Sequence, residues 1–163
     1  MGDNSEWLNN PQGKIAKGAL CPACGRYNSR DVVGHALVIR DRKVLMIKRG
    51  IEPMKGWWAL PAGYLDWDES LEENTLRELK EEAGMEGEIV GLLGIYSDPN
   101  RDENGQQNVG VVYVVKPKSE ARVGEEVTEV SWFGLDALPD KIAFDHRKMI
   151  LDYVEKNQND KKM

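Results

Sequence analysis

Runs of hydrophobic residues separated by polar turns predict strands on both sides of a central helix. The stretch "DVVGHALVIRDRKVLMIKRG" holds two β-branched runs parted by the polar "RDRK", which predicts a hairpin with strands near 32–39 and 44–48. Three later runs, "GEIVGLLGIYS", "NVGVVYVV" and "EVTEVSWF", predict further strands. Strands before and after a helix, with a second helix at the end, indicate a mixed α/β domain.

The central helix is marked at both ends. Ser70 precedes it and Glu73 stands three residues later, which is a capping-box pattern, and Gly84 is a typical residue just beyond a helix end. At about 100° per residue, one face of this helix is apolar. The residues on that face are Leu76, Leu79 and Ala83.

The rest of the chain is organised around this domain. Residues 1–30 form a polar, Gly-rich extension that ends in a Cys pair, residues 31–157 form the domain, and 158–163 form a polar tail. The segment "IEPMKGWWALPAG" predicts a loop with a short extended piece at 57–60, and "DPNRDENGQQ" predicts another loop. Apolar residues near helical spacing in "FDHRKMILDYVEKN" predict the closing helix.

Length and charge narrow the possible functions. The 163 residues suffice for one domain with a core. Because 28 acidic and 22 basic residues give a net charge of −6, there is no overall field to hold a long nucleic acid. No run is long enough for an apolar membrane span, and the beginning "MGDNSEWLNN" lacks the regions of a signal peptide, so a cytoplasmic location is the expectation.

Cys21 and Cys24, in "CPACG", are spaced like half of a four-ligand zinc site. The other half is missing, because His35 and His146 are the only histidines and neither belongs to a pair with finger spacing. Three interpretations stay open: a free knuckle, zinc completed by distant ligands or by a second subunit in a homodimer, and redox chemistry.

Three carboxylates of the central helix have neighbouring positions. Glu78 reaches Glu81 and Glu82 at the i+3 and i+4 offsets, so the three side chains converge. Such a cluster suits a hard divalent cation, Mg²⁺ or Mn²⁺, which also binds phosphate oxygens. The alternative is a solvated face of an acidic protein.

The segment "GYLDWDESLEENTLRELKEEAGM" resembles the Nudix box in every fixed position: Gly63, five residues, Glu69, seven residues, "REL", one residue, "EE", one residue, Gly84 and the apolar Met85. The resemblance extends from about 32 to 153, through "WWALPAG" and "FDHR". It implies an α/β/α sandwich with a mixed β-sheet. It also implies a Nudix pyrophosphohydrolase, which uses divalent metals to hydrolyse a diphosphate linked to another moiety, usually a nucleoside.

The resemblance implies roles for the box residues. Glu78, Glu81 and Glu82 match metal ligands, and Ala62 stands where a glycine carbonyl often binds metal. Glu81 and Glu82 are expected to be catalytic, and Arg77 supports them by pairing with Glu69. The general base is one of four acids, since family members differ at this point. The candidates are Glu81, Glu125, Glu126 and Glu129, with Glu81 preferred, and each could instead be only solvated or a metal ligand.

Substrate-binding candidates lie outside the box. Trp58 and Tyr96 are aromatic residues that could stack on a base, although aromatics in strands are more often core. Arg101 could meet a phosphate or only solvent. Pro99 resembles a proline of relatives that split ADP-ribose, and its alternative is an ordinary turn proline. Trp57 is a further aromatic candidate.

The expected reaction is therefore hydrolysis of ADP-ribose to AMP and ribose 5-phosphate with Mg²⁺ or Mn²⁺. Alternatives within the family are a nucleoside triphosphate pyrophosphohydrolase that removes oxidised nucleotides and an NADH pyrophosphatase. The second is disfavoured because the other Cys pair of those relatives is missing. An alternative of a different class is a nucleotide-sensing module without catalysis.

Overall fold

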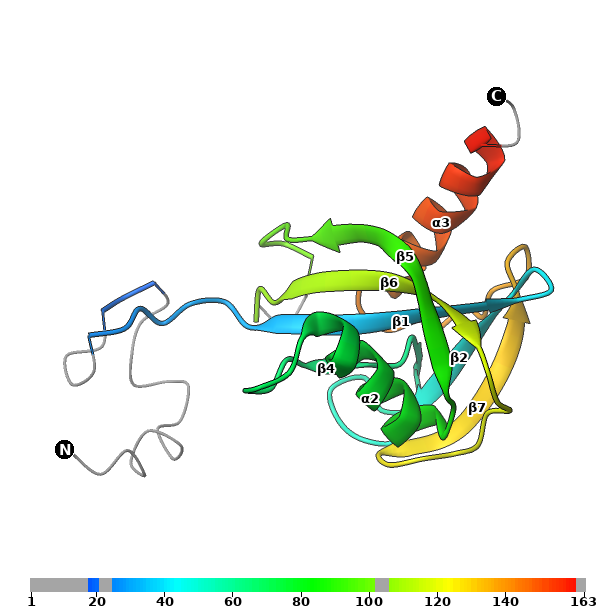
Figure 1. Ribbon diagram of the computed structural model, residues 1–163, viewed down its shortest axis with the longest axis horizontal. Coiled ribbons are helices and arrows are strands. Elements are labelled where there is room, and N and C mark those ends of the chain that lie inside the picture. Colours follow the sequence, from blue (N-terminus) through cyan, green and yellow to red (C-terminus); the bar gives the residue numbers. More distant parts are fainter. Residues whose placement is uncertain (1–17, 21–24, 102–105, 161–163) are drawn as a thin grey trace. The chain divides into compact units, whose positions relative to one another are not determined.

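The computed structural model describes residues 18–20, 25–101 and 106–160 (Figure 1). The chain divides into two compact units, Met1–Arg30 and Asp31–Met163. Within the first unit Leu20 and Tyr27 form an antiparallel bridge. Cys21 and Cys24 lie outside the described residues, so a zinc site there stays a prediction.

The second unit is built from strands and two helices. Their bounds are β1 Val32–Arg40, β2 Lys43–Arg49, β3 Trp58–Ala59, β4 Ala62–Tyr64, α2 Leu71–Ala83, β5 Gly87–Tyr96, β6 Val109–Pro117, β7 Val127–Gly134 and α3 His146–Asp160. The predicted elements are all present, and only the short β4 was missed. The helix α3 extends to Asp160, through the first residues of the expected tail. In the described part of the chain, no helix has both the length and the apolar character to cross a membrane.

The sheet is mixed, and β1 belongs to both of its halves. On one side β1 pairs in parallel with β6, which pairs with β5, and β4 pairs antiparallel with β1. On the other side β2 pairs with β3 and β7. The strands β1 and β2 pair only next to their turn and then diverge (Figure 1). Asp41 and Arg42 make this turn with φ of 50° and 58°, as a tight hairpin requires.

The two faces of the sheet bury separate cores because successive strand residues point to opposite sides. On one face the buried residues of β1, β2 and β6 pack with Leu79, Ala83 and Met85 of the α2 segment. On the other face Leu37, Val112 and their neighbours pack with Met149 and Ile150 of α3. The predicted α/β/α sandwich is confirmed.

The helix α2 is capped at both ends. Ser70 and Glu73 form the predicted capping box, and Gly84 has a φ of 55° in the left-handed region. Beyond Gly84, a segment distant in sequence satisfies the remaining carbonyls: the N–H groups of Arg122, Gly124 and Glu125 donate to Ala83, Glu82 and Glu81 at 2.8, 3.0 and 2.8 Å. The loop before β7 is thereby fixed against the acidic end of α2.

Candidate active site

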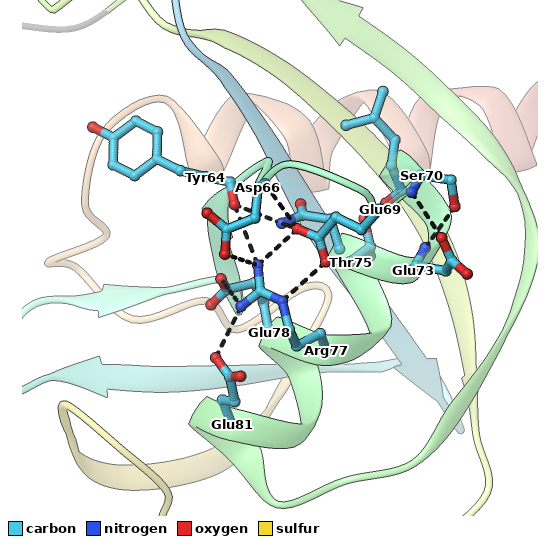
Figure 2. A network of polar contacts seen from close by, with 11 residues as sticks. Tyr64, Asp66, Glu69, Ser70, Glu73, Thr75, Arg77, Glu78 and Glu81 are labelled. Carbon is cyan, nitrogen blue, oxygen red and sulfur yellow. Dashed lines mark hydrogen bonds and ion pairs between the residues drawn. The ribbon is translucent and has the colours of Figure 1, made fainter. Parts of the chain in front are cut away.

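Arg77 is the centre of a polar network between α2 and the loop that precedes it (Figure 2). Its Nε and Nη2 donate to the two carboxylate oxygens of Glu69 at 3.0 and 2.9 Å. Glu69 also accepts from the Asp66 N–H at 2.9 Å. The hydrogen bonds from Arg77 lower the pKa of Glu69 to about 2. The predicted pair is present, and it attaches the loop to the helix.

The same guanidinium holds two of the box carboxylates. Nη1 of Arg77 donates to Oε1 of Glu78 at 2.7 Å and to Oε2 of Glu81 at 3.0 Å (Figure 2). The side chain of Glu78 is 14% exposed, whereas that of Glu81 is 42% exposed. Burial raises the pKa of Glu78, and the pairing with Arg77 opposes that effect.

Gly63 gives the Glu78 carboxylate its space. A Cβ on Gly63 would lie 2.0 Å from the carboxyl carbon of Glu78 and within 2.4 Å of both its oxygens. No side chain can therefore stand at position 63 while Glu78 keeps this place. The glycine of the box is explained by this close approach.

Glu82 is a partly buried carboxylate of the site. Its Oε2 accepts from the Ala62 N–H at 2.9 Å. Burial raises its pKa to about 8, and the nearby charge of Glu78 adds to the rise, while the Ala62 hydrogen bond and Arg49 oppose it. What the structure shows for Ala62 is this N–H contact, and metal binding by its carbonyl stays a prediction.

A pocket of about 220 Å³ opens beside Glu82. It is lined by residues of β1, β2, β4 and the beginning of α3 together with neighbouring loops. Among them are Arg49, Ala62, Gly63, Glu82, Phe144 and His146. Backbone and side chains of the box thus form one wall of a pocket, as is typical of active sites.

Arg49 is a pocket residue that the sequence reasoning missed. Its Nε donates to the Pro53 carbonyl at 2.8 Å, and its guanidinium lies 5.0 Å from the Phe144 ring centroid. Within the described part of the chain, its two Nη atoms have no hydrogen-bond acceptor. The sequence feature that could have identified Arg49 is a cationic residue at the end of an apolar strand, directly before Gly50. Arg49 can offer a paired donor to a phosphate.

The structure does not bring Trp58 or Tyr96 to this pocket. The Trp58 ring packs against Phe133 at a centroid distance of 4.7 Å, within the core on the α3 side. Tyr96 lines a separate groove of about 730 Å³ between β5 and α3, where its hydroxyl donates to Asp152 at 2.9 Å. Trp57 packs against the other core. The core interpretation of the tryptophans is the one that the packing supports.

Arg101 lines both the pocket and the groove, but its donors are occupied. Its Nε and Nη2 donate to the two oxygens of Asp145 at 2.9 and 2.7 Å, and its Nη1 donates to the Asn108 carbonyl at 2.8 Å. Its side chain is 6% exposed. Arg101 therefore connects the loop after β5 to the start of α3. Pro99 lies in the turn that the Arg101 N–H closes on the Asp98 carbonyl at 3.1 Å.

The later acids differ in their distance from the site. Glu126 is close enough to act electrostatically on both Glu82 and Arg49. Its carbonyl accepts from the Gly50 N–H at 2.7 Å, which fixes it beside the end of β2. Glu129 instead pairs with Lys48 at 3.2 Å on an exposed part of the sheet.

The donor set fits a hard divalent cation in its chemistry. Glu78 and Glu82 are carboxylates with raised pKa values in or beside one pocket, and a cation there would offset the cost of their burial. As arranged, however, no group of three or more acidic, His or Cys side chains among the described residues is close enough to hold a metal. The predicted convergence is incomplete because Arg77 lies between Glu78 and Glu81.

Comparisons with known proteins agree with this geometry. The family model of the NUDIX domain matches residues 29–153. The curated ADP-ribose pyrophosphatase of Methanocaldococcus jannaschii is 40% identical over 72% of this chain and 69% of its own.

Solved structures give the same fold. The MutT NUDIX hydrolase of Burkholderia pseudomallei is 33% identical, with a TM-score of 0.69 over 76% of this chain and 97% of that one. The NUDIX domain of Shewanella oneidensis NrtR, solved with ADP ribose, is 26% identical, with a TM-score of 0.68 over 96% and 99% of the two chains. Members of this family generally use Mg²⁺ or Mn²⁺. The chain belongs to the Nudix family and is a Nudix pyrophosphohydrolase.

Proposed function

We propose that this protein hydrolyses ADP-ribose to AMP and ribose 5-phosphate with Mg²⁺ or Mn²⁺. The observation that carries the site assignment is that the partly buried Glu82 carboxylate and the Arg49 guanidinium line one pocket. One group suits a cation and the other suits a phosphate. The choice of ADP-ribose rests on the 40% identical relative named for that activity and on the related domain solved with ADP ribose.

The residues of this chain have distinct parts in the reaction. Glu82 and Glu78 would hold the metal, with Glu81 joining them on leaving Arg77, and the bound ion would offset phosphate charge and acidify water. Arg49 orients the diphosphate through its Nη atoms. Water attacks one phosphorus, the bond from that phosphorus to the bridging oxygen breaks, and the bridging oxygen leaves with the other phosphate.

We place the general base at Glu126 in preference to Glu81. Glu126 acts electrostatically on both Glu82 and Arg49, whereas Glu81 is held by Arg77. The backbone N–H of Glu125 donates to the Glu81 carbonyl at the end of α2, and the Glu129 carboxylate pairs with Lys48. A carboxylate beside the pocket can take the proton of the attacking water.

Product analysis tests the assignment. The protein is incubated with Mg²⁺ or Mn²⁺ and, separately, ADP-ribose, NADH, dinucleoside polyphosphates, and ordinary and oxidised nucleoside triphosphates. AMP and ribose 5-phosphate are expected from ADP-ribose. Glu82→Gln should lower turnover about 10²–10³-fold, while the exposed control Glu125→Gln should not.

Two other results would contradict the assignment of ADP-ribose as the substrate. Release of pyrophosphate from a nucleoside triphosphate, with ADP-ribose untouched, would favour the nucleoside triphosphate alternative. Tight binding of ADP-ribose without turnover at any metal concentration would favour a sensing module.

A further inference from the structure

The segment Leu60–Pro61–Ala62 lies between the two halves of the sheet. β3 ends at Ala59, which pairs with Ile47 of β2, and β4 begins at Ala62, which pairs with His35 of β1. Leu60 and Pro61 therefore have no strand partner in either ladder, although Leu60 is only 1% exposed. A buried N–H that leaves a ladder needs another acceptor.

Both N–H groups of this segment donate hydrogen bonds to side chains. The Leu60 N–H donates to Nδ1 of His146 at 3.0 Å, and the Ala62 N–H donates to Oε2 of Glu82 at 2.9 Å. Pro61 has no N–H, and its carbonyl accepts from the Ala36 N–H at 2.9 Å. A displacement of Leu60 would therefore be transmitted through one proline to the donor that holds Glu82.

The residues just before α3 fix the other end of this segment. The Trp58 N–H donates to the Lys141 carbonyl at 2.9 Å, and the Ala143 N–H donates to the Trp58 carbonyl at 2.7 Å. His146 follows three residues later and is 3% exposed. Its ring meets the His35 ring edge-on at a centroid distance of 5.0 Å, which fixes its orientation.

We infer that His146 is a positioning residue for Glu82. By accepting from the Leu60 N–H, it sets the path of the chain through Pro61 and so aims the Ala62 N–H at the Glu82 carboxylate. It touches neither metal nor substrate in this role. The inference rests on the family reaction, diphosphate hydrolysis, and not on the choice of ADP-ribose.

The protonation state of His146 agrees with an acceptor at Nδ1. Burial holds its pKa well below the ordinary value, with the charges of Arg101 and Arg49 and the neighbouring His35 adding to this effect. A neutral ring that accepts at Nδ1 carries its proton on Nε2. The arrangement needs an acceptor at the position of Nδ1, and this requirement can be tested chemically.

Three substitutions separate the acceptor from the bulk of the ring. In His146→Asn the amide oxygen can stand near the position of Nδ1, in His146→Gln the amide reaches toward the position of Nε2, and in His146→Leu there is no acceptor. For any substrate that the wild type turns over, we expect kcat to fall about 10–100-fold in His146→Leu and His146→Gln. The KM for substrate should change little, and His146→Asn should recover most of the rate.

Amide hydrogen exchange gives a readout that needs no substrate. The Leu60 amide should lose protection in His146→Leu and His146→Gln and keep it in His146→Asn. The Trp58 amide, which donates to a backbone carbonyl, is the internal control and should stay protected in all three. The Mn²⁺ affinity should weaken in parallel with kcat.

The comparison of the His146 variants has two possible outcomes. A higher kcat and stronger Leu60 protection in His146→Asn than in His146→Gln support the role, and this comparison stands even if His146→Leu does not fold. Equal behaviour of the Asn and Gln variants, or an unchanged kcat in a folded His146→Leu, would overturn it. If ADP-ribose proves to be no substrate, the exchange and Mn²⁺ measurements still decide.

Discussion

The carboxyl group of Glu78 occupies the space that any side chain at Gly63 would need. The distance from an ideal Cβ at Gly63 to the Glu78 carboxyl carbon is 2.0 Å. Gly63→Ala must therefore move Glu78 or the β4 strand, and kcat should fall about a hundredfold. Gly91→Ala is the control, because nothing lies within 4 Å of a Cβ there. Equal activity of the two variants would show that Glu78 adapts freely.

Glu82 makes the stability of the metal-free protein dependent on pH. Its pKa is raised from 4.5 to about 8, so the folded state binds this proton more tightly than the unfolded state. The stabilisation is complete below about pH 4.5 and is lost as the pH rises through 8, with a slope of up to about 1.4 kcal/mol per pH unit.

Urea unfolding in the presence of a chelator, from pH 5 to pH 9, measures this effect. Wild type should lose stability relative to Glu82→Gln as the pH rises, and Glu125→Gln should follow the wild type. Mn²⁺ should restore stability at high pH, by about 2.7 kcal/mol at a hundred times its dissociation constant. Parallel curves for wild type and Glu82→Gln would contradict the raised pKa.

Glu126 should carry most of the base function. Glu126→Gln removes the proton acceptor and should lower kcat about 10²–10⁴-fold with little change in stability. Glu129→Gln breaks only the exposed pair with Lys48 and is expected to keep its activity. The pH–rate profile shows whether the acidic limb disappears with Glu126, because a general base acts only when it is deprotonated. A larger loss in Glu81→Gln, with the profile intact in Glu126→Gln, would move the base to the box.

Arg49 should contribute chiefly to substrate binding. Arg49→Lys keeps a charge but loses the planar pair of Nη donors, so KM should rise about tenfold. Arg40→Lys changes an arginine whose guanidinium pairs with Glu120 on the surface, and it serves as the control. Steady-state kinetics with the best substrate of the panel compare KM in Arg49→Lys and Arg40→Lys. An unchanged KM in Arg49→Lys would argue against phosphate contact.

Arg101 should matter for stability rather than for binding. Its pair with Asp145 is buried, with side chains 6% and 13% exposed, so Arg101→Met leaves an unpaired carboxylate and should cost about 3–5 kcal/mol. Arg40→Met breaks the exposed pair with Glu120 and should have no measurable effect on urea unfolding. Similar losses in both variants would contradict the distinction.

The roles of the box residues could be predicted from the sequence because they depend on contacts within one short segment. The cap at Ser70, the end at Gly84 and the i, i+4 spacing of Glu78 and Glu82 depend on neighbouring residues of one helix. The pairing of Arg77 with Glu69 also lies within one short segment. Burial of Asn74 and Thr75 was not foreseen, because polar residues are mostly exposed. Their place depends on contacts outside the helix: Asn74 donates to the Tyr64 carbonyl, and both side chains lie against Gly34, which has no Cβ.

The surroundings of the substrate candidates could not be predicted because they are not local. Arg101 was a candidate for a phosphate contact, and Asp145, forty-four residues later, takes two of its donors. Trp58 was a candidate for stacking on a base with the core as the commoner alternative, and it packs against Phe133. Neither partner is fixed until the strands are paired.

By itself, the sequence determined the strand and helix pattern, the family and the carboxylates that belong to the box. Tertiary structure alone decided that Glu82 lies partly buried beside Arg49, that Arg77 donates to both Glu78 and Glu81, and that His146 accepts from the Leu60 N–H just before the box. Local patterns follow from the geometry of one helix or strand. Burial, pKa shifts and pocket walls depend instead on which segments distant in sequence pack together. Those contacts form only when the sheet packs against its two helices.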